Sequence, residues 1–225
     1  MKRQIYILPL IALFFQVHFI DGQDSSATFK NQIKFSPSAT VNFFDNGLEL
    51  SYERLFSKKV SAEISAMYFV DLFKMNFNEH TNIHGGRLSI AGKYFYTANS
   101  IVRQYFASDL TYDKSTFNTI ERFGSQTWLR DSVSYANSYL DSILVNRTGV
   151  SFNLRWGLQI SIIHLIIDLS AGIGAKRWDI THDGRINQSD KLGAIWHKGY
   201  SYETIEQGRR FTYNIPISLK IGYVF

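Results

Sequence analysis

The chain has 225 residues, of which 45% are hydrophobic, a formal net charge of +5 and no cysteine. This length suits one domain, and the lack of cysteine excludes both disulfides and a lipidated cysteine. The basic residues are scattered along the chain, which argues against a nucleic-acid partner. Beyond the first twenty residues no apolar run approaches the ~20 residues of a membrane helix, so any membrane insertion must use β-strands.

The amino terminus has the layout of a secretory signal. Lys2 and Arg3 precede an apolar run over residues 5–20 and a polar segment over residues 21–26. We predict a signal peptide over 1–22, cleaved after Gly22, a periplasmic segment over 23–31 and one β-barrel domain over 32–225.

Eight segments then alternate apolar and polar side chains with the period of two that is typical of β-strands. The predicted strands cover residues 32–43, 48–56, 60–72, 86–97, 101–112, 150–161, 165–178 and 211–225. Short turns are expected at 45–47, 57–59, 99–100 and 162–164, and longer loops at 73–85, 113–147 and 179–207. Within the loop 113–147, Asp131 or Ser132 can cap a short helix with one apolar face, formed by Val133, Ala136, Leu140, Ile143 and Leu144.

The last predicted strand has the longest apolar face, with eight alternating residues from Phe211 to Phe225. A membrane-spanning strand needs about 9 to 11 residues with apolar side chains outward and aromatic residues at the interfaces. Short turns also alternate with longer loops along the chain, which is typical of outer-membrane barrels. The predicted fold is therefore all-β, an eight-stranded antiparallel up-and-down transmembrane β-barrel with long extracellular loops.

Charged residues recur on the inward positions of the predicted strands. An eight-stranded barrel is only wide enough for its own side chains, and buried charges are tolerated when they are paired. We therefore predict an interlocked ionic network and no continuous pore, formed by Glu49, Glu53, Glu63, Asp168, Arg87, Lys93, Arg155 and Lys220. Solvated faces of a soluble sheet are the alternative, but they do not explain why the opposite faces are uniformly apolar.

One loop motif is similar to the calcium loop of EF-hand and dockerin proteins. Oxygen ligands at positions 1, 3, 5, 7, 9 and 12, with a glycine at position 6, can wrap one hard cation. The corresponding residues are Asp179, Thr181, Asp183, Arg185, Asn187 and Asp190, with Gly184 at the sixth position. Thr181 departs from the motif, the entering helix is missing, and a polar surface loop accounts for the same composition. No metal site is therefore assigned and no cofactor is expected, with Ca²⁺ kept as the alternative.

The signal-like start, the strand alternation, the loop asymmetry and the ending KIGYVF resemble the small bacterial outer-membrane β-barrel proteins of the OmpA-barrel, OmpX and OmpW type, a porin-family group. The resemblance implies location in the bacterial cell outer membrane, contact with outer-membrane lipid and insertion by the barrel-assembly machinery. It also implies an assembly signal at Leu219, Ile221, Tyr223 and Phe225. These relatives have diverse roles, so the resemblance predicts architecture rather than activity.

The function we predict is that of a non-enzymatic outer-membrane barrel in envelope structure or surface recognition. An extracellular protein or glycan is the candidate partner of loops 113–147 and 179–207, and no nucleic-acid partner is expected. Two alternatives stay open. One is a soluble secreted barrel that carries an apolar ligand with its apolar face inward, and the other is a lipid-modifying outer-membrane enzyme, although no nucleophile elbow occurs in the sequence.

Overall fold

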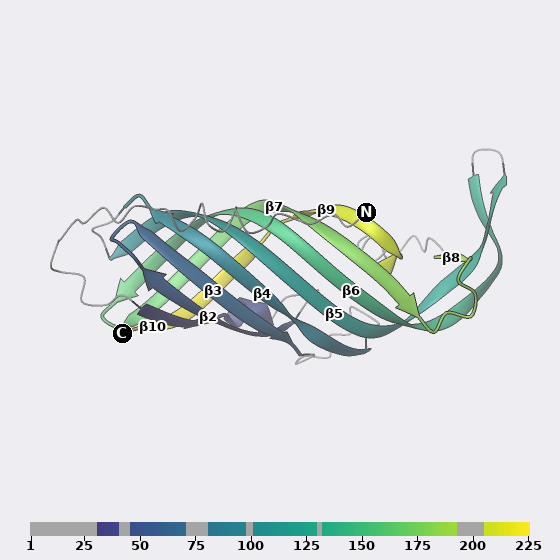
Figure 1. Cartoon of the computed structure of the whole chain (residues 1–225), viewed down its shortest axis with the longest axis horizontal. Coiled ribbons are helices and arrows are strands. Elements are labelled where there is room, and N and C mark those ends of the chain that lie inside the picture. Colours follow the sequence, from purple (N-terminus) through teal and green to yellow (C-terminus); the bar gives the residue numbers. More distant parts are fainter. Residues whose placement is uncertain (1–30, 41–45, 71–80, 98–100, 130–131, 193–204) are drawn as a thin grey trace, which may run out of the picture.

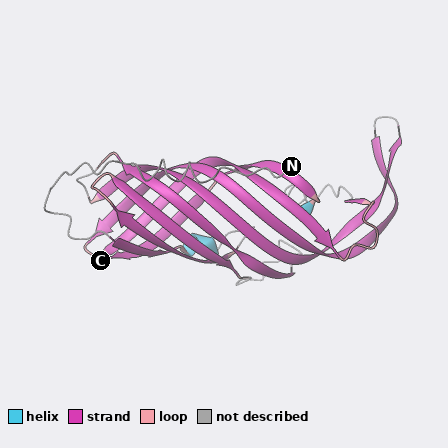
Figure 2. Cartoon of the chain, viewed as in Figure 1, coloured by secondary structure: helices cyan, strands magenta, loops and turns pink. Residues whose placement is uncertain are grey.

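The computed structural model describes residues 31–40, 46–70, 81–97, 101–129, 132–192 and 205–225, and this part of the chain is almost entirely strand (Figure 2). The predicted signal peptide and residues 23–30 of the predicted periplasmic segment lie outside the described residues. No helix within the described part is long and apolar enough to cross a membrane. The elements, in chain order, are β1 (Asn31–Phe35), α2 (Pro37–Thr40), β2 (Gly47–Leu55), β3 (Val60–Phe69), β4 (Thr81–Phe95), β5 (Val102–Leu129), β6 (Ser132–Ile162), β7 (Leu165–Asp183), β8 (Lys191–Leu192), β9 (Gly208–Asn214) and β10 (Ile217–Val224).

The strands form a closed antiparallel barrel (Figure 1). Consecutive strands from β1 to β7 pair with one another, and β10 pairs with both β7 and β1. β9 and β10 lie on the same flank of β7 in one register, with Gly174 opposite Asn214 and Ala171 opposite Ile217. They form a single barrel strand interrupted at Pro216, which has no N–H to donate. The predicted eight-stranded antiparallel barrel is confirmed.

The barrel is apolar outside and polar inside. On β6, Phe152 and Leu154 are more than half exposed, whereas Ser151 and Asn153, which alternate with them, are buried. The same alternation surrounds the barrel, with exposed residues that include Ile33, Leu50, Ile64, Ile90, Leu110, Leu154, Leu169 and Ile221. We call this surface the apolar belt. Its polarity is the reverse of that of a soluble protein, so it is a surface suited to lipid.

The prediction of a loop with a short helix over residues 113–147 is wrong. β5 and β6 stay paired from Val102–Ile160 to Leu129–Ser132, and their hairpin projects beyond the barrel at the end opposite to the carboxyl terminus of β10 (Figure 1). Leu140 and Ile143 have helical spacing, but on β6 Leu140 is exposed and Ile143 is fully buried. The apolar residues of the predicted helix are three or four positions apart because some lie on the inward face of β6 and others on its outward face. This spacing imitates the pattern of a helix.

The predicted loop 179–207 is also partly wrong, because β7 continues to Asp183 and β8 pairs with β5. We call residues 114–129, 132–148 and 177–192 the extension. Polar side chains such as Lys114 and Asp179 face outward here, next to exposed apolar residues such as Ile120 and Leu140. Its interior is an apolar core of Phe117, Phe123, Ile143, Val145, Trp178, Ile180 and Leu192, packed with Ile205. This is the arrangement expected for strands that have left lipid and entered water.

The first strand is shorter than predicted. β1 ends at Phe35 because Pro37 cannot donate to the ladder, and α2 follows. Ala39, which lies within the predicted strand 32–43, is buried against Met67 and Phe69. The hydroxyls of Ser36 and Ser38 both donate to the carbonyl of Leu219, and the Leu219 N–H donates to Ser38. These serine side chains therefore make the hydrogen bonds to the Leu219 backbone that a longer β1 would have made with its own backbone.

Candidate functional site: the interior charge cluster

Seven ionisable side chains meet inside the barrel from six different strands. Each occupies an inward position of an alternating strand, so its direction follows from the register that turns the apolar side chains of the same strand outward. We call them the charge cluster: Lys34 of β1, Glu49 and Glu53 of β2, Glu63 of β3, Lys93 of β4, Asp168 of β7 and Lys220 of β10. Six of these residues were predicted as interior-network residues, and Lys34 was predicted to face inward.

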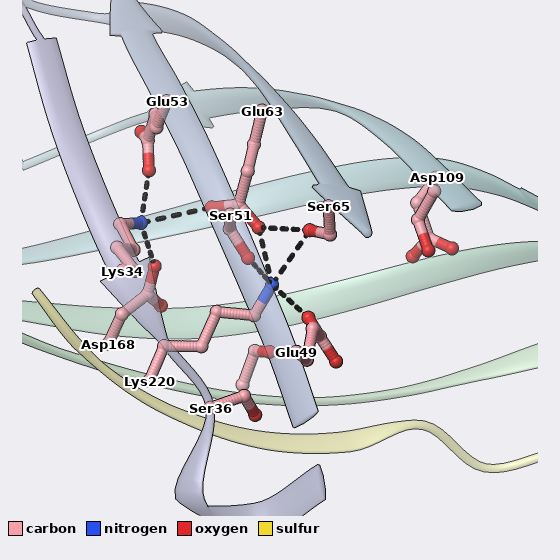
Figure 3. A network of polar contacts seen from close by, with 12 residues as sticks. Lys34, Ser36, Glu49, Ser51, Glu53, Glu63, Ser65, Asp109, Asp168 and Lys220 are labelled. Atoms are coloured by element: carbon pink, nitrogen blue, oxygen red, sulfur yellow. Dashed lines mark hydrogen bonds and ion pairs between the residues drawn. The ribbon is translucent and has the colours of Figure 1, made fainter. Parts of the chain in front are cut away.

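Two lysines connect the same three carboxylates. The Lys34 ammonium contacts Glu53 and lies 3.0 Å from Glu63 and 2.5 Å from Asp168 (Figure 3). The Lys93 ammonium lies 2.9 Å from Glu53, 2.7 Å from Glu63 and 2.8 Å from Asp168. All five side chains are almost completely buried. Each charge therefore has several opposite charges as neighbours, which is the condition for tolerating ions out of water.

Lys220 extends the cluster along the barrel interior. Its ammonium lies 2.7 Å from both Glu49 and Glu63, and it donates to the hydroxyls of Ser51 at 2.8 Å and Ser65 at 3.0 Å (Figure 3). Glu63 thus accepts from three lysines of three strands. The cluster joins strands that are far apart in sequence, including the closing strand β10.

The cluster also contains three acidic groups close enough to hold a metal ion. Carboxylate oxygens of Glu53, Glu63 and Asp168 all lie within 4.8 Å of one another. The ammonium groups of Lys34 and Lys93 already contact those oxygens, however. They supply the positive charge that a cation would bring, so we assign no metal to this site.

Two further ion-pair groups on inward strand positions contain the remaining predicted residues. The Arg155 guanidinium is 2.7 Å from Asp109, which also accepts from the Asn153 amide at 2.7 Å. Arg87 contacts Asp113, whose other oxygen is 2.8 Å from Lys176. All eight predicted interior residues therefore face inward, and the structure divides them among three groups.

Sequence reasoning missed several interior residues, and Asp113 and Tyr105 are two that lie in the barrel. Asp113 was placed in a loop although it continues the inward phase of Asp109 and Thr111, so the period of two was the available signal. Tyr105 is fully buried and its hydroxyl donates to Asp168 at 2.5 Å. Its inward direction needed the β5 register, because this strand has the least regular alternation at its start.

The calcium-like motif is not brought together. Asp179, Thr181 and Asp183 lie on the outward face of β7, where alternate side chains are about 7 Å apart along an extended strand. Asp183 accepts from the Asn146 amide at 2.7 Å, and Asp190 accepts from the Tyr139 hydroxyl at 3.0 Å. The other two positions are Arg185, which donates to the Asp190 carbonyl, and the exposed Asn187. Because no loop wraps these side chains around one point, we propose no calcium site.

The residues of the predicted assembly signal line the outside of β10. Ile221, Tyr223 and Phe225 are exposed, and Leu219 is partly exposed. Phe225 exchanges two backbone hydrogen bonds with Asn31 at 2.9 and 3.2 Å, which closes the barrel beside β1. The structure therefore gives these residues an outward-facing and wall-closing position, and their role as an assembly signal stays a prediction.

A closed barrel with an apolar belt and a charged, densely connected interior has the organisation of a small membrane-spanning β-barrel. No protein-family model and no curated protein matches the chain. Two solved structures are similar to it. The N-terminal β-barrel domain of Pseudomonas aeruginosa OprF shares 12% identity at a TM-score of 0.37, over 87% of this chain and 96% of that one. A major outer membrane protein from Thermus thermophilus shares 8% identity at a TM-score of 0.37, over 88% of this chain and 100% of that one.

Proposed function

We propose that this chain is a non-enzymatic barrel of the bacterial outer membrane, inserted by the barrel-assembly machinery, that acts in envelope structure or surface recognition. The observation that carries the proposal is the inverted polarity of the barrel, with an apolar belt outside and the charge cluster inside. Such a surface is stable in lipid and costly in water.

The charge cluster would close the barrel to ions. An ion that passes the level of Glu63 would have to separate it from Lys34, Lys93 and Lys220. Separating one partner of a buried pair costs about 3 to 5 kcal/mol because an uncompensated charge is left behind. We therefore propose a structural scaffold rather than a pore.

The extension is the surface that we propose for recognition of an extracellular protein or glycan. Its apolar core packs strands β5, β6 and β7 together beyond the apolar belt, which gives a firm platform on the outside. The tip of the β5–β6 hairpin is the part of the paired strands farthest from the barrel (Figure 1).

The two alternatives fit the geometry less well. A soluble ligand carrier needs its apolar face inward, whereas here the inward face of the barrel holds the charge cluster. For a lipid-modifying enzyme, a histidine paired with a serine would be the expected signature. Of the three histidines within the described residues, His164 and His182 contact the carbonyls of Val224 and Ile205, and His84 is exposed on β4.

Gel mobility of the detergent-extracted protein, with and without boiling, tests the proposal. We expect the unboiled form to migrate differently from the boiled form and to resist protease everywhere except in the extension. In planar bilayers the folded protein should give no steady single-channel conductance. A water-soluble protein with unchanged mobility would reject the membrane barrel, and a steady conductance would reject the closed interior alone.

A further inference from the structure

We propose that three outward-facing cations at the outer end of the apolar belt bind phosphate groups of lipid headgroups. Lys114 of β5, Arg177 of β7 and Arg209 of β9, together with Thr148 of β6, form what we call the basic patch. The proposal rests on the membrane location proposed above and adds a lipid class to it.

The strand register brings these residues together. Lys114 is opposite Thr148, Thr148 is opposite Asp179, and Asp179 is opposite Arg209. Their side chains therefore lie in one outward-facing row across four neighbouring strands. Arg177 precedes Asp179 by two positions on the same face of β7, so it lies one row nearer to the apolar belt.

The patch lies where the outer surface changes from apolar to polar. The adjacent row contains Tyr112, Val150 and Phe211 together with Arg177, and all three of these apolar side chains are exposed. Arg177 also lies over the Phe211 ring, 6.0 Å from its centroid. Aromatic residues at the interface beside cations are the surroundings that a phosphorylated headgroup meets.

The charges of the patch are available to a ligand. Lys114 and Arg177 are exposed, and within the described part of the chain no carboxylate lies at ion-pair distance from either. Arg209 is 3.3 Å from Asp179, but these side chains are 70% and 50% exposed, so the pair is open to water and to a competing anion. Three cations face one carboxylate, Asp179, so the patch keeps a net positive charge.

The cations are concentrated at the boundary rather than spread over the extension. The next outward positions away from the belt are neutral, with Thr116 and Asn118 on β5, Asn146 on β6 and Thr181 on β7. Arg122 is a separate exposed cation on β5, eight residues beyond Lys114. If the cations served only solubility, they would not have to lie at this boundary. A layer of phosphate groups at the level of the headgroups would attract positive charge to this boundary.

The test compares lipid binding by the folded protein in neutral detergent. The probes are diphosphoryl lipid A, the same lipid after removal of both phosphates, and inorganic phosphate, and the readout is the temperature at which the heat-modifiable form is lost. We expect the phosphorylated lipid to raise this temperature more than the other two probes. Added salt should reduce the difference, because exposed charges are screened.

The double variant Lys114→Gln/Arg177→Gln should bind the phosphorylated lipid about tenfold or more weakly, since each cation near such a surface contributes about 1 kcal/mol. Arg122→Gln is the matched control and should bind like the unchanged protein. The charge-preserving variant Lys114→Arg/Arg177→Lys should also keep its affinity.

Equal responses to the two lipids, an effect insensitive to salt, or equal losses in the Arg122→Gln control would overturn the proposal. An equal response to inorganic phosphate would show that the patch binds a simple anion and does not recognise the lipid. Each of these results leaves a heat-modifiable barrel intact. Failure of the membrane proposal would instead appear as loss of heat modifiability in the unchanged protein.

Discussion

Leu154 and Asn153 are adjacent residues on β6 that meet different media. Leu154 is 56% exposed in the apolar belt, whereas Asn153 is buried and donates to Asp109. A strand turns successive residues to opposite faces. A polar side chain at position 154 would therefore face the apolar side, and an apolar side chain at position 153 would face the polar interior. The polarity of each residue is therefore decided by its phase along the strand.

Replacing Leu154 by arginine should destabilise the protein in lipid by about 2 to 4 kcal/mol, because the charge would have to enter the hydrocarbon layer. Reversible urea unfolding from phosphatidylcholine vesicles measures this free energy. The control is Ser142→Arg, an outward position of the same strand within the extension, which should change stability by less than about 0.5 kcal/mol. Equal costs at the two positions would show that Leu154 does not face lipid.

Strands β5 and β6 pack closely where an aromatic ring of β5 lies over a glycine of β6. Tyr105 is opposite Gly157, and a Cβ on Gly157 would lie 2.2 Å from the tyrosine ring. The ring in turn lies 4.8 Å from the Lys93 ammonium, and its hydroxyl donates to Asp168. The absent side chain at Gly157 thus gives Tyr105 the space to reach the charge cluster.

The substitution Gly157→Val should destabilise the barrel by about 1 to 3 kcal/mol, because it would displace a fully buried ring. Gly92→Val is the matched control on β4, since nothing lies within 4 Å of a Cβ at this exposed position. Urea unfolding in the same vesicles compares the two. If both glycines tolerated valine equally, the fit of Tyr105 against Gly157 would be unimportant for stability.

The whole molecule consists of two parts with different interiors, joined by continuous strands. The barrel holds its charges inside, and the extension holds its apolar core inside. His182 belongs to the extension, where its ring packs edge-on to Phe123 and contacts the Ile205 carbonyl. Burial lowers the pKa of His182 from its ordinary value of 6.5, and the nearby Arg185 lowers it further.

The extension should therefore open on acidification while the barrel stays closed. A histidine with a lowered pKa in the folded state favours the neutral form, so its contribution is fully present above pH 6.5 and is lost as the pH falls through the folded-state pKa. Hydrogen exchange, corrected for intrinsic rates, should increase for residues 177–183 between about pH 7.5 and about pH 5, but not for residues 150–162.

His182→Gln should abolish most of this pH dependence, and His84→Gln should keep it because His84 is exposed on β4. If the His84 variant lost the dependence instead, the assignment to His182 would be wrong. Equal opening of residues 150–162 would show that the two parts unfold as one unit.

The period of two in the sequence determined most of the fold. It predicted the barrel, the outward positions of its strands and the inward direction of residues such as Glu63 and Lys220, because alternation needs no knowledge of distant contacts. It failed in the extension, where apolar residues change from the outer to the inner face between Tyr112 and Phe117. The rule that apolar residues face outward therefore holds for the barrel strands but not for the extension.

Only the tertiary structure decided which charges share a site and where the wall closes. Alternation gives each side chain a face but no partner, so the meeting of Lys34 with Asp168, 134 residues apart, depended on the closed register. The serine contacts that β10 makes beyond the end of β1 and the row of cations in the basic patch depended on the same register. These features arise from pairings between distant strands, and the local sequence carries no signal for such pairings.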